Sequence, residues 1–351
     1  MHPRIDRDHS IDLLRGFFIC IVIVDHIGWF PSAFEVVSGR GGLFASAAEG
    51  FLLISGVLVG QIRGGEVKSG RFGVAAWRCL RRAGVLALWT AIVTLVLHVV
   101  AHDMTSVPEM LPPLRDDGPL RTVLLAITLR YCYGHHSFLA FYALYLLAAP
   151  AVLWLLARGQ TLVVLLASFG LWLGALLVPG TSSWSGGFAE HSWQVLFVLG
   201  VVVGFHRDEL RAAWRRSGID GEAIFRIAAA LALATFALSW FLFHNQSVVY
   251  RQLFKREEIG PGRLAFAILW TSALYAAVKR HEQAVVRAVG RFFLPLGRHS
   301  LYVFLVHAVI IFPLFSEPMH SLVVDTLVDA CVVGLMWVLV SRRVLFRLIP
   351  S

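Results

Sequence analysis

Ten apolar stretches, most of them long enough to cross a bilayer as a helix, constrain this chain more than any other feature. They cover residues 11–30, 43–61, 83–101, 137–157, 161–179, 193–206, 223–243, 262–280, 299–315 and 321–341. Lipid offers backbone groups no hydrogen-bond partners, so such stretches are expected to be helical. The sequence therefore predicts an all-α, polytopic integral membrane helical bundle of about ten transmembrane helices, in a single domain over residues 1–351.

The distribution of basic residues gives these spans a direction. When both ends of the chain are placed in the cytoplasm, the cytoplasmic segments hold 21 Lys and Arg residues and the outer segments hold seven. The richest cytoplasmic connections are 62–82 and 279–298. This bias is the one expected from the positive-inside rule, so we expect both termini in the cytoplasm.

One apolar segment, 120–133, does not fit as an eleventh span. It is short and is interrupted by Arg121 and Arg130. Counting it as a span would also move the arginines at 207–216 to the outside, against the same rule. We therefore expect a re-entrant or interfacial helix here, on the outer side of the membrane.

Composition excludes several classes of function. The chain is 58% hydrophobic and only 15% charged, whereas soluble domains are about 25% charged. The net charge of +9 comes from arginines in the connections rather than from a basic segment with stacking aromatics, so no nucleic-acid partner is expected. The four cysteines are scattered without metal-ligand or disulfide spacing. His98 and His102 are four residues apart but lack a third ligand, and we expect no metal.

Two ionisable residues lie inside the first apolar stretch. Arg15 and His26 are 11 residues apart, which places them on nearly the same helix face, about 16 Å apart along the axis. Such groups are costly within a membrane and usually mark function. Glu49, near the start of the second span, shares its depth with His26. We expect Glu49 to contact His26 and to orient it as a general base.

The cytoplasmic connection between the second and third spans is a candidate site for an anionic ligand. Its arginines include Arg63, Arg78, Arg81 and Arg82. Together with Arg15 they could bind the phosphates of a molecule that enters from the cytoplasm. The alternatives are orientation of the chain and contact with anionic membrane lipid. In the second span, Gly56 and Gly60 are expected to permit close helix packing.

Two further candidates concern the outer side of the membrane. His307 lies at mid-membrane in the ninth span and is expected to line the same cavity as His26. His136, after the re-entrant segment, is a candidate for contacting an acceptor molecule.

Several of these segments also form a recognisable set of motifs. They are HSIDLLRGF at 9–17 with DHI at 25–27, AAEGF at 47–51 with SG at 55–56, WQVLFVLG at 193–200, GPGRL at 260–264, and LGRHSLYVF at 296–304. Together they resemble the OpgC-type (osmoregulated periplasmic glucan succinyltransferase) branch of the membrane acyltransferase (acyltransferase family 3) superfamily. The first motif is also similar to that of glucosaminide N-acetyltransferases.

The resemblance implies a bacterial inner-membrane enzyme. It would move an acyl group, succinyl or acetyl, from cytoplasmic acyl-CoA to a hydroxyl of an extracytoplasmic glycan, with no permanently bound cofactor. By the same resemblance His26 is the catalytic histidine, Arg15 is its essential partner, and Trp193 and Arg263 are candidates for substrate binding. A transporter or flippase, or an N-acetyltransferase acting on an amino sugar, stays open as an alternative.

Overall fold

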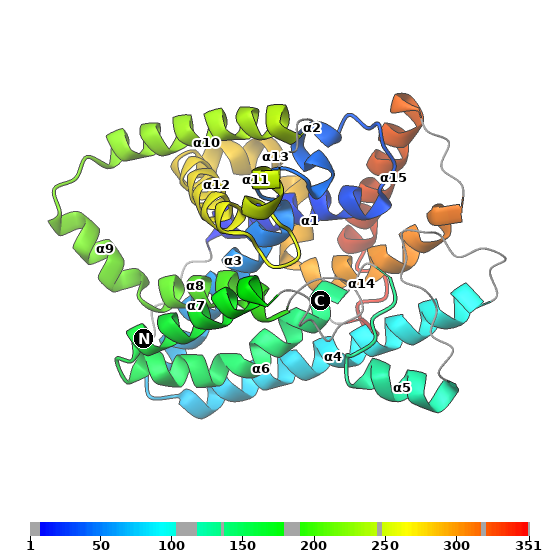
Figure 1. Cartoon of the computed structure of the whole chain (residues 1–351), viewed down its shortest axis with the longest axis horizontal. Coiled ribbons are helices and arrows are strands. Elements are labelled where there is room, and N and C mark those ends of the chain that lie inside the picture. Colours follow the sequence, from blue (N-terminus) through cyan, green and yellow to red (C-terminus); the bar gives the residue numbers. More distant parts are fainter. Residues whose placement is uncertain are drawn as a thin grey trace.

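The computed structural model describes residues 8–102, 118–134, 137–178, 190–243, 248–316 and 321–349, and every regular element within these ranges is a helix (Figure 1). The predicted all-α class is confirmed. Each of the ten predicted spans falls on one helix. These helices are α1 (His9–Ile27), α3 (Ala47–Lys68), α4 (Phe72–His102), α6 (Ser137–Ala157), α7 (Thr161–Leu177), α8 (Glu190–Phe205), α10 (Gly221–Phe243), α12 (Pro261–Arg280), α14 (Ser300–Ile311) and α15 (Leu322–Ser341).

The number of membrane crossings is lower when length and apolarity are both required. Among the described residues, five helices meet this requirement, namely α4, α6, α10, α12 and α15. A sixth crossing is possible if α13 (Glu282–Arg298) and α14, which are bent by 82° relative to each other, form one broken span. The other helices are shorter or more polar: α7 and α8 have 17 and 16 residues, and α1 carries three charged side chains. The chain is a helical membrane protein, but ten crossings are not confirmed.

The segment that was not expected to span forms the short helix α5 (Pro119–Ile127). Nine residues of α-helix cover only about 14 Å, less than half of a bilayer core. Three other short elements lie between the long helices: α2 (Glu35–Ser38) with the 3-10 turn Gly39–Gly41, α9 (Arg207–Arg216), and α11 (Val248–Leu253). A second 3-10 turn, Phe312–Ser316, ends α14.

Glycines hold α3 against α8 at backbone distance. A Cβ added to Gly56 or Gly60 would lie 2.2 Å or 2.1 Å from a carbonyl oxygen of α8. Gly200 and Gly204 on α8 meet carbonyl oxygens of α3 in the same way. The predicted packing role of Gly56 and Gly60 is confirmed, and the facing pair on α8 completes the contact.

The cytoplasmic connection predicted at 279–298 is largely a helix, α13, that packs closely against α1. A Cβ on Gly16 would lie 2.1 Å from the carbonyl oxygen of Phe293, and one on Gly297 would lie 1.8 Å from that of Asp12. These two glycines bring α13 onto α1 at the level of Arg15. The chain then bends at His299 and continues as α14, which also packs against α1.

Candidate functional site

The first contact of interest joins two histidines from α1 and α14. Nδ1 of His26 lies 2.9 Å from Nε2 of His307, and the planes of the two rings are only 16° apart, with their centroids 5.2 Å from each other. Nδ1 of His307 lies 2.9 Å from the carbonyl oxygen of Val303, one turn earlier in α14. His307 is fully buried, whereas His26 is half-buried. The sequence predicted that His307 lines the same cavity as His26; the structure brings the two side chains into contact, and a shared cavity stays a prediction.

These distances fix where the protons lie. A carbonyl oxygen only accepts, so Nδ1 of His307 carries a proton and donates it to Val303. Nε2 of a neutral His307 then has a lone pair, which accepts the proton on Nδ1 of His26. In this tautomer Nε2 of His26 is the basic nitrogen. The pair therefore gives His26 the protonation pattern that a general base requires.

A second polar contact joins the same two helices nearer their N-terminal ends. Arg15 donates from Nη2 to Oγ of Ser300 over 2.5 Å, and its guanidinium lies 5.4 Å from the centre of the Phe51 ring. Ser300 and His307 are seven residues apart, which is nearly two helical turns, so both lie on one face of α14. The helices run in the same direction, with Arg15 opposite Ser300 and His26 opposite His307.

Aromatic rings lie around these contacts. Phe304 lies between Ser300 and His307 in sequence, and its ring is 6.3 Å from that of His26. It also packs on Phe51 and Phe138, at 5.8 Å and 5.4 Å between ring centres. Since Phe51 also contacts Arg15, these rings connect the surroundings of the two polar contacts.

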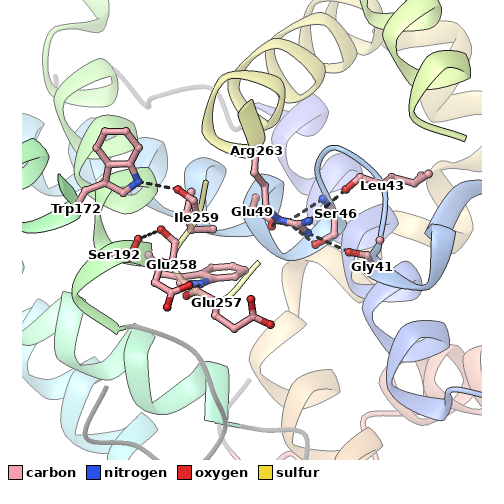
Figure 2. A network of polar contacts seen from close by, with 12 residues as sticks. Gly41, Leu43, Ser46, Glu49, Trp172, Ser192, Glu257, Glu258, Ile259 and Arg263 are labelled. Atoms are coloured by element: carbon pink, nitrogen blue, oxygen red, sulfur yellow. Dashed lines mark hydrogen bonds and ion pairs between the residues drawn. The ribbon is translucent and has the colours of Figure 1, made fainter. Parts of the chain in front are cut away.

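The predicted contact between Glu49 and His26 is wrong. Glu49 is fully buried and forms an ion pair with Arg263 of α12 (Figure 2). Its other carboxylate oxygen accepts from the backbone N–H and the hydroxyl of Ser46, so it caps α3. Glu49 is directed instead toward a cation on another helix.

Arg263 has a structural position in the same network (Figure 2). Besides Glu49, its guanidinium donates to the carbonyl oxygens of Leu43 and Gly41, each at 3.2 Å. Arg263 is only 1% exposed. This burial argues against the predicted contact of Arg263 with a substrate: the side chain ties the segment before α3 to α12.

Trp193 is also buried, at 2% exposure, and its indole N–H donates to the carbonyl oxygen of Glu257 at 3.1 Å. The next two carbonyls are bound in turn: Ser192 donates to that of Glu258 and Trp172 to that of Ile259 (Figure 2). Trp193 therefore helps to fix the segment that leads into α12, which argues against a direct contact with a substrate.

The basic connection after α3 is partly neutralised by the carboxylate of Glu66, which was not among the predicted site residues. Glu66 forms ion pairs with both Arg63 and Arg78. Arg81 is exposed and Arg82 is half-buried. Arg63 and Arg78 are therefore held by Glu66, whereas phosphate binding by Arg81 and Arg82 stays a prediction.

The N-terminal end of α1 is held by a compact polar cluster. Asp8 accepts hydrogen bonds from Tyr275 at 2.9 Å and from Lys279 at 3.2 Å. Burial alone would raise the pKa of the Asp8 carboxyl, but these two partners lower it below its ordinary value.

His136, the predicted contact for an acceptor molecule, lies outside the described residues. Within the described ranges, no three His, Cys, Asp or Glu side chains are grouped as metal ligands would be.

Ser300 contacts Arg15, and His307 contacts His26. The seven-residue spacing of Ser300 and His307 was a sequence signal that both lie on one helix face, and both were already within a motif or a predicted span. No comparable sequence pattern indicates the ion pairs of Glu66 or the close approach of α13 to α1 at Gly297.

In comparisons with known proteins, a family model described as OpgC protein matches residues 7–347. No curated protein matches the chain.

Proposed function

Because the chain belongs to the OpgC family, we propose that it is a membrane acyltransferase that transfers an acyl group from acyl-CoA to a hydroxyl of a periplasmic glucan. The resemblance described above favours succinyl or acetyl as the acyl group. The proposed location is the bacterial inner membrane, with both termini in the cytoplasm. The observation that carries the proposal is the directed hydrogen bond between His26 and His307.

In the proposed reaction, Nε2 of His26 removes the proton from the glucan hydroxyl as its oxygen attacks the thioester carbonyl. A carbon–oxygen bond forms, the carbon–sulfur bond breaks, and the proton passes from His26 to the departing CoA thiolate. His307 is a positioning residue: its lone pair accepts from Nδ1 of His26 and stabilises the imidazolium that forms. Direct transfer needs no covalent acyl-enzyme.

We place the anionic part of the donor near the cytoplasmic end of α1, with Arg81 and Arg82 as its phosphate contacts. Arg15 is about 16 Å from His26 along the axis and on the same face, held by Ser300. An extended pantetheine arm covers a similar distance. The donor could therefore enter from the cytoplasm while its thioester reaches His26.

The test is release of free CoA thiol by proteoliposomes supplied with acyl-CoA and glucan. His26→Ala is expected to reduce transfer by roughly 10²- to 10⁴-fold. His307→Leu should reduce it by roughly 10- to 100-fold and alter the pH profile, because it removes one hydrogen bond to the charged form of His26. His307→Asn, which keeps an acceptor, should recover part of the loss.

His281→Ala is the matched control, since His281 is exposed at the junction of α12 and α13. Full transfer by His26→Ala would refute the proposal. A transporter or flippase would move solute across the vesicle membrane without releasing thiol, and an N-acetyltransferase would require an amino sugar as acceptor.

A further inference from the structure

A cavity of about 400 Å³ lies between α8 and α12, beside α3. Most of its wall is aliphatic, and its lining includes Leu53, Val57, Leu199, Val203 and Ile268. Relative to Phe51, Leu53, Val57 and Gln61 project about 200°, 240° and 280° around α3, and Ile54 projects about 300°. Phe51 itself, which contacts Arg15 and Phe304, is not part of the lining.

The cytoplasmic end of this cavity is cationic. Arg207 and Arg211, four residues apart on α9, are part of its lining, with Leu210 between them. Arg207 also lies 3.8 Å from Asp8, whereas Arg211 is exposed. Residues four apart lie on one helix face, so both guanidinium groups are directed to the same end of the cavity.

The position of α9 is fixed by Lys68 at the end of α3. Its ammonium group donates to the carbonyl oxygen of Phe205 at 2.7 Å and to Glu209 at 2.8 Å. Leu210 and Trp214 of α9 are nevertheless about half exposed, at 50% and 46%. Exposed apolar side chains beside arginines are typical of a helix that lies at the membrane surface.

The depth of the cavity suits one leaflet of a bilayer. Its lining on α12 extends from Ile268 to Tyr275, about 10 Å along the helix axis. The hydrocarbon layer of one leaflet is about 15 Å thick. A chain with its head at α9 would therefore remain within the cytoplasmic half of the membrane.

A second cavity, of about 410 Å³, offers a comparison. It lies between α1, α10 and α12, and its lining is mostly alanine, leucine and aromatic residues without a cationic side chain. Both cavities touch Thr271, but only the one at α9 combines an apolar bore with a pair of arginines. A ligand with both a phosphate and a hydrocarbon chain fits that combination.

We propose that the cavity between α8 and α12 binds an anionic phospholipid, whose phosphate contacts Arg207 and Arg211 and whose acyl chain lies against the aliphatic wall. The donor acyl-CoA has a phosphate as well, but most of the lining is aliphatic, which suits a hydrocarbon chain better than the two amides of a pantetheine arm. The polar members of the lining besides the arginines are Gln61, Thr271, Ser272 and Tyr275. The site is independent of the proposed acyl transfer, because binding requires neither donor nor acceptor.

The test measures phosphatidylglycerol and phosphatidylcholine retained by the purified full chain, using native mass spectrometry with each lipid titrated. Arg207→Gln/Arg211→Gln should weaken retention of phosphatidylglycerol by roughly 30-fold and leave phosphatidylcholine almost unchanged. Arg215→Gln/Arg216→Gln removes the same charge from α9 outside the cavity lining, and should retain phosphatidylglycerol as the unaltered chain does.

A second variant keeps the proposal testable if loss of the Arg207 contact with Asp8 prevents folding. Ser272 lines the cavity and is exposed, so Ser272→Trp would fill the apolar part of the cavity without changing the charge of its lining. It should reduce phosphatidylglycerol retention at least tenfold. Equal retention by all variants would overturn the proposal. Displacement of phosphatidylglycerol by free CoA would also overturn it, and would assign the two arginines to the donor.

Discussion

Replacing Gly297 with alanine tests whether the crossing of α13 over α1 positions the polar contacts. The added Cβ would lie 1.8 Å from the carbonyl oxygen of Asp12, whereas ordinary Cβ contacts begin at 3.4 Å. The helices must therefore separate by about 1.6 Å, the difference between these distances. Because α14 follows α13 directly, Ser300 moves with it. The 2.5 Å bond from Arg15 would lengthen to about 4 Å and be lost.

The expected cost has two parts. Overpacking of this kind destabilises a protein by about 1–3 kcal/mol. A displacement of about 1 Å at a catalytic group reduces the rate by roughly 10²-fold. Both are measurable in detergent or proteoliposomes, as a lower unfolding midpoint and as slower release of CoA thiol.

The matched control is Gly84→Ala in α4, where a Cβ would meet no atom within 4 Å. It should leave transfer unchanged and stabilise the helix by up to about 1 kcal/mol. If Gly297→Ala transferred acyl groups at the native rate and unfolded at the native temperature, the crossing would not position Ser300, and the reasoning would be refuted.

Three further predictions concern the contacts around this crossing. Ser300→Ala should slow transfer about tenfold, because it removes a hydrogen bond to a charged group, and Ser300→Thr should restore it; equal rates for both would contradict the role of the hydroxyl. Arg263→Gln should cost about 3–5 kcal/mol in unfolding measurements by leaving Glu49 buried without its cation, and adding Glu49→Gln should recover part of that loss; strictly additive losses would count against the pair. Asp8→Asn should lower the unfolding midpoint at pH 7. Since the folded state lowers the pKa of Asp8, the difference from the native chain should close as the pH falls below about 4; a difference that persists in acid would argue against this origin.

The sequence was sufficient to locate the long helices because a continuous apolar stretch in lipid must satisfy its backbone hydrogen bonds within itself, as a helix does. It also identified Gly56 and Gly60 as a packing surface, since small residues four apart lie on one face. It did not identify α13, whose apolar residues alternate with arginines at helical spacing on one amphipathic helix. A count of charges assigns such a segment to a connection, whereas its apolar face packs on α1.

The error at Glu49 has a different physical origin. Depth in the membrane follows from residue number, but the partner of a side chain depends on how each helix is rotated about its axis. Arg263 comes from a helix more than 200 residues later and provides a full positive charge, which stabilises a buried carboxylate better than a neutral imidazole can. No local pattern in the sequence indicates that Arg263 rather than His26 faces Glu49.

The pairing of His26 with His307 explains how a base can be kept within a membrane protein at a low free-energy cost of desolvation. A carboxylate buried beside His26 would need a counter-charge of its own, and the buried Glu49 already requires Arg263. A neutral imidazole needs no counter-charge: His307 uses one nitrogen for the carbonyl of Val303 in its own helix and leaves the other to accept from His26. Both ring nitrogens of His307 therefore have a partner, one within α14 and one on α1. The glycines at the α1–α13 crossing let α13 pack closely on α1, and this packing positions α14, and with it His307, beside His26.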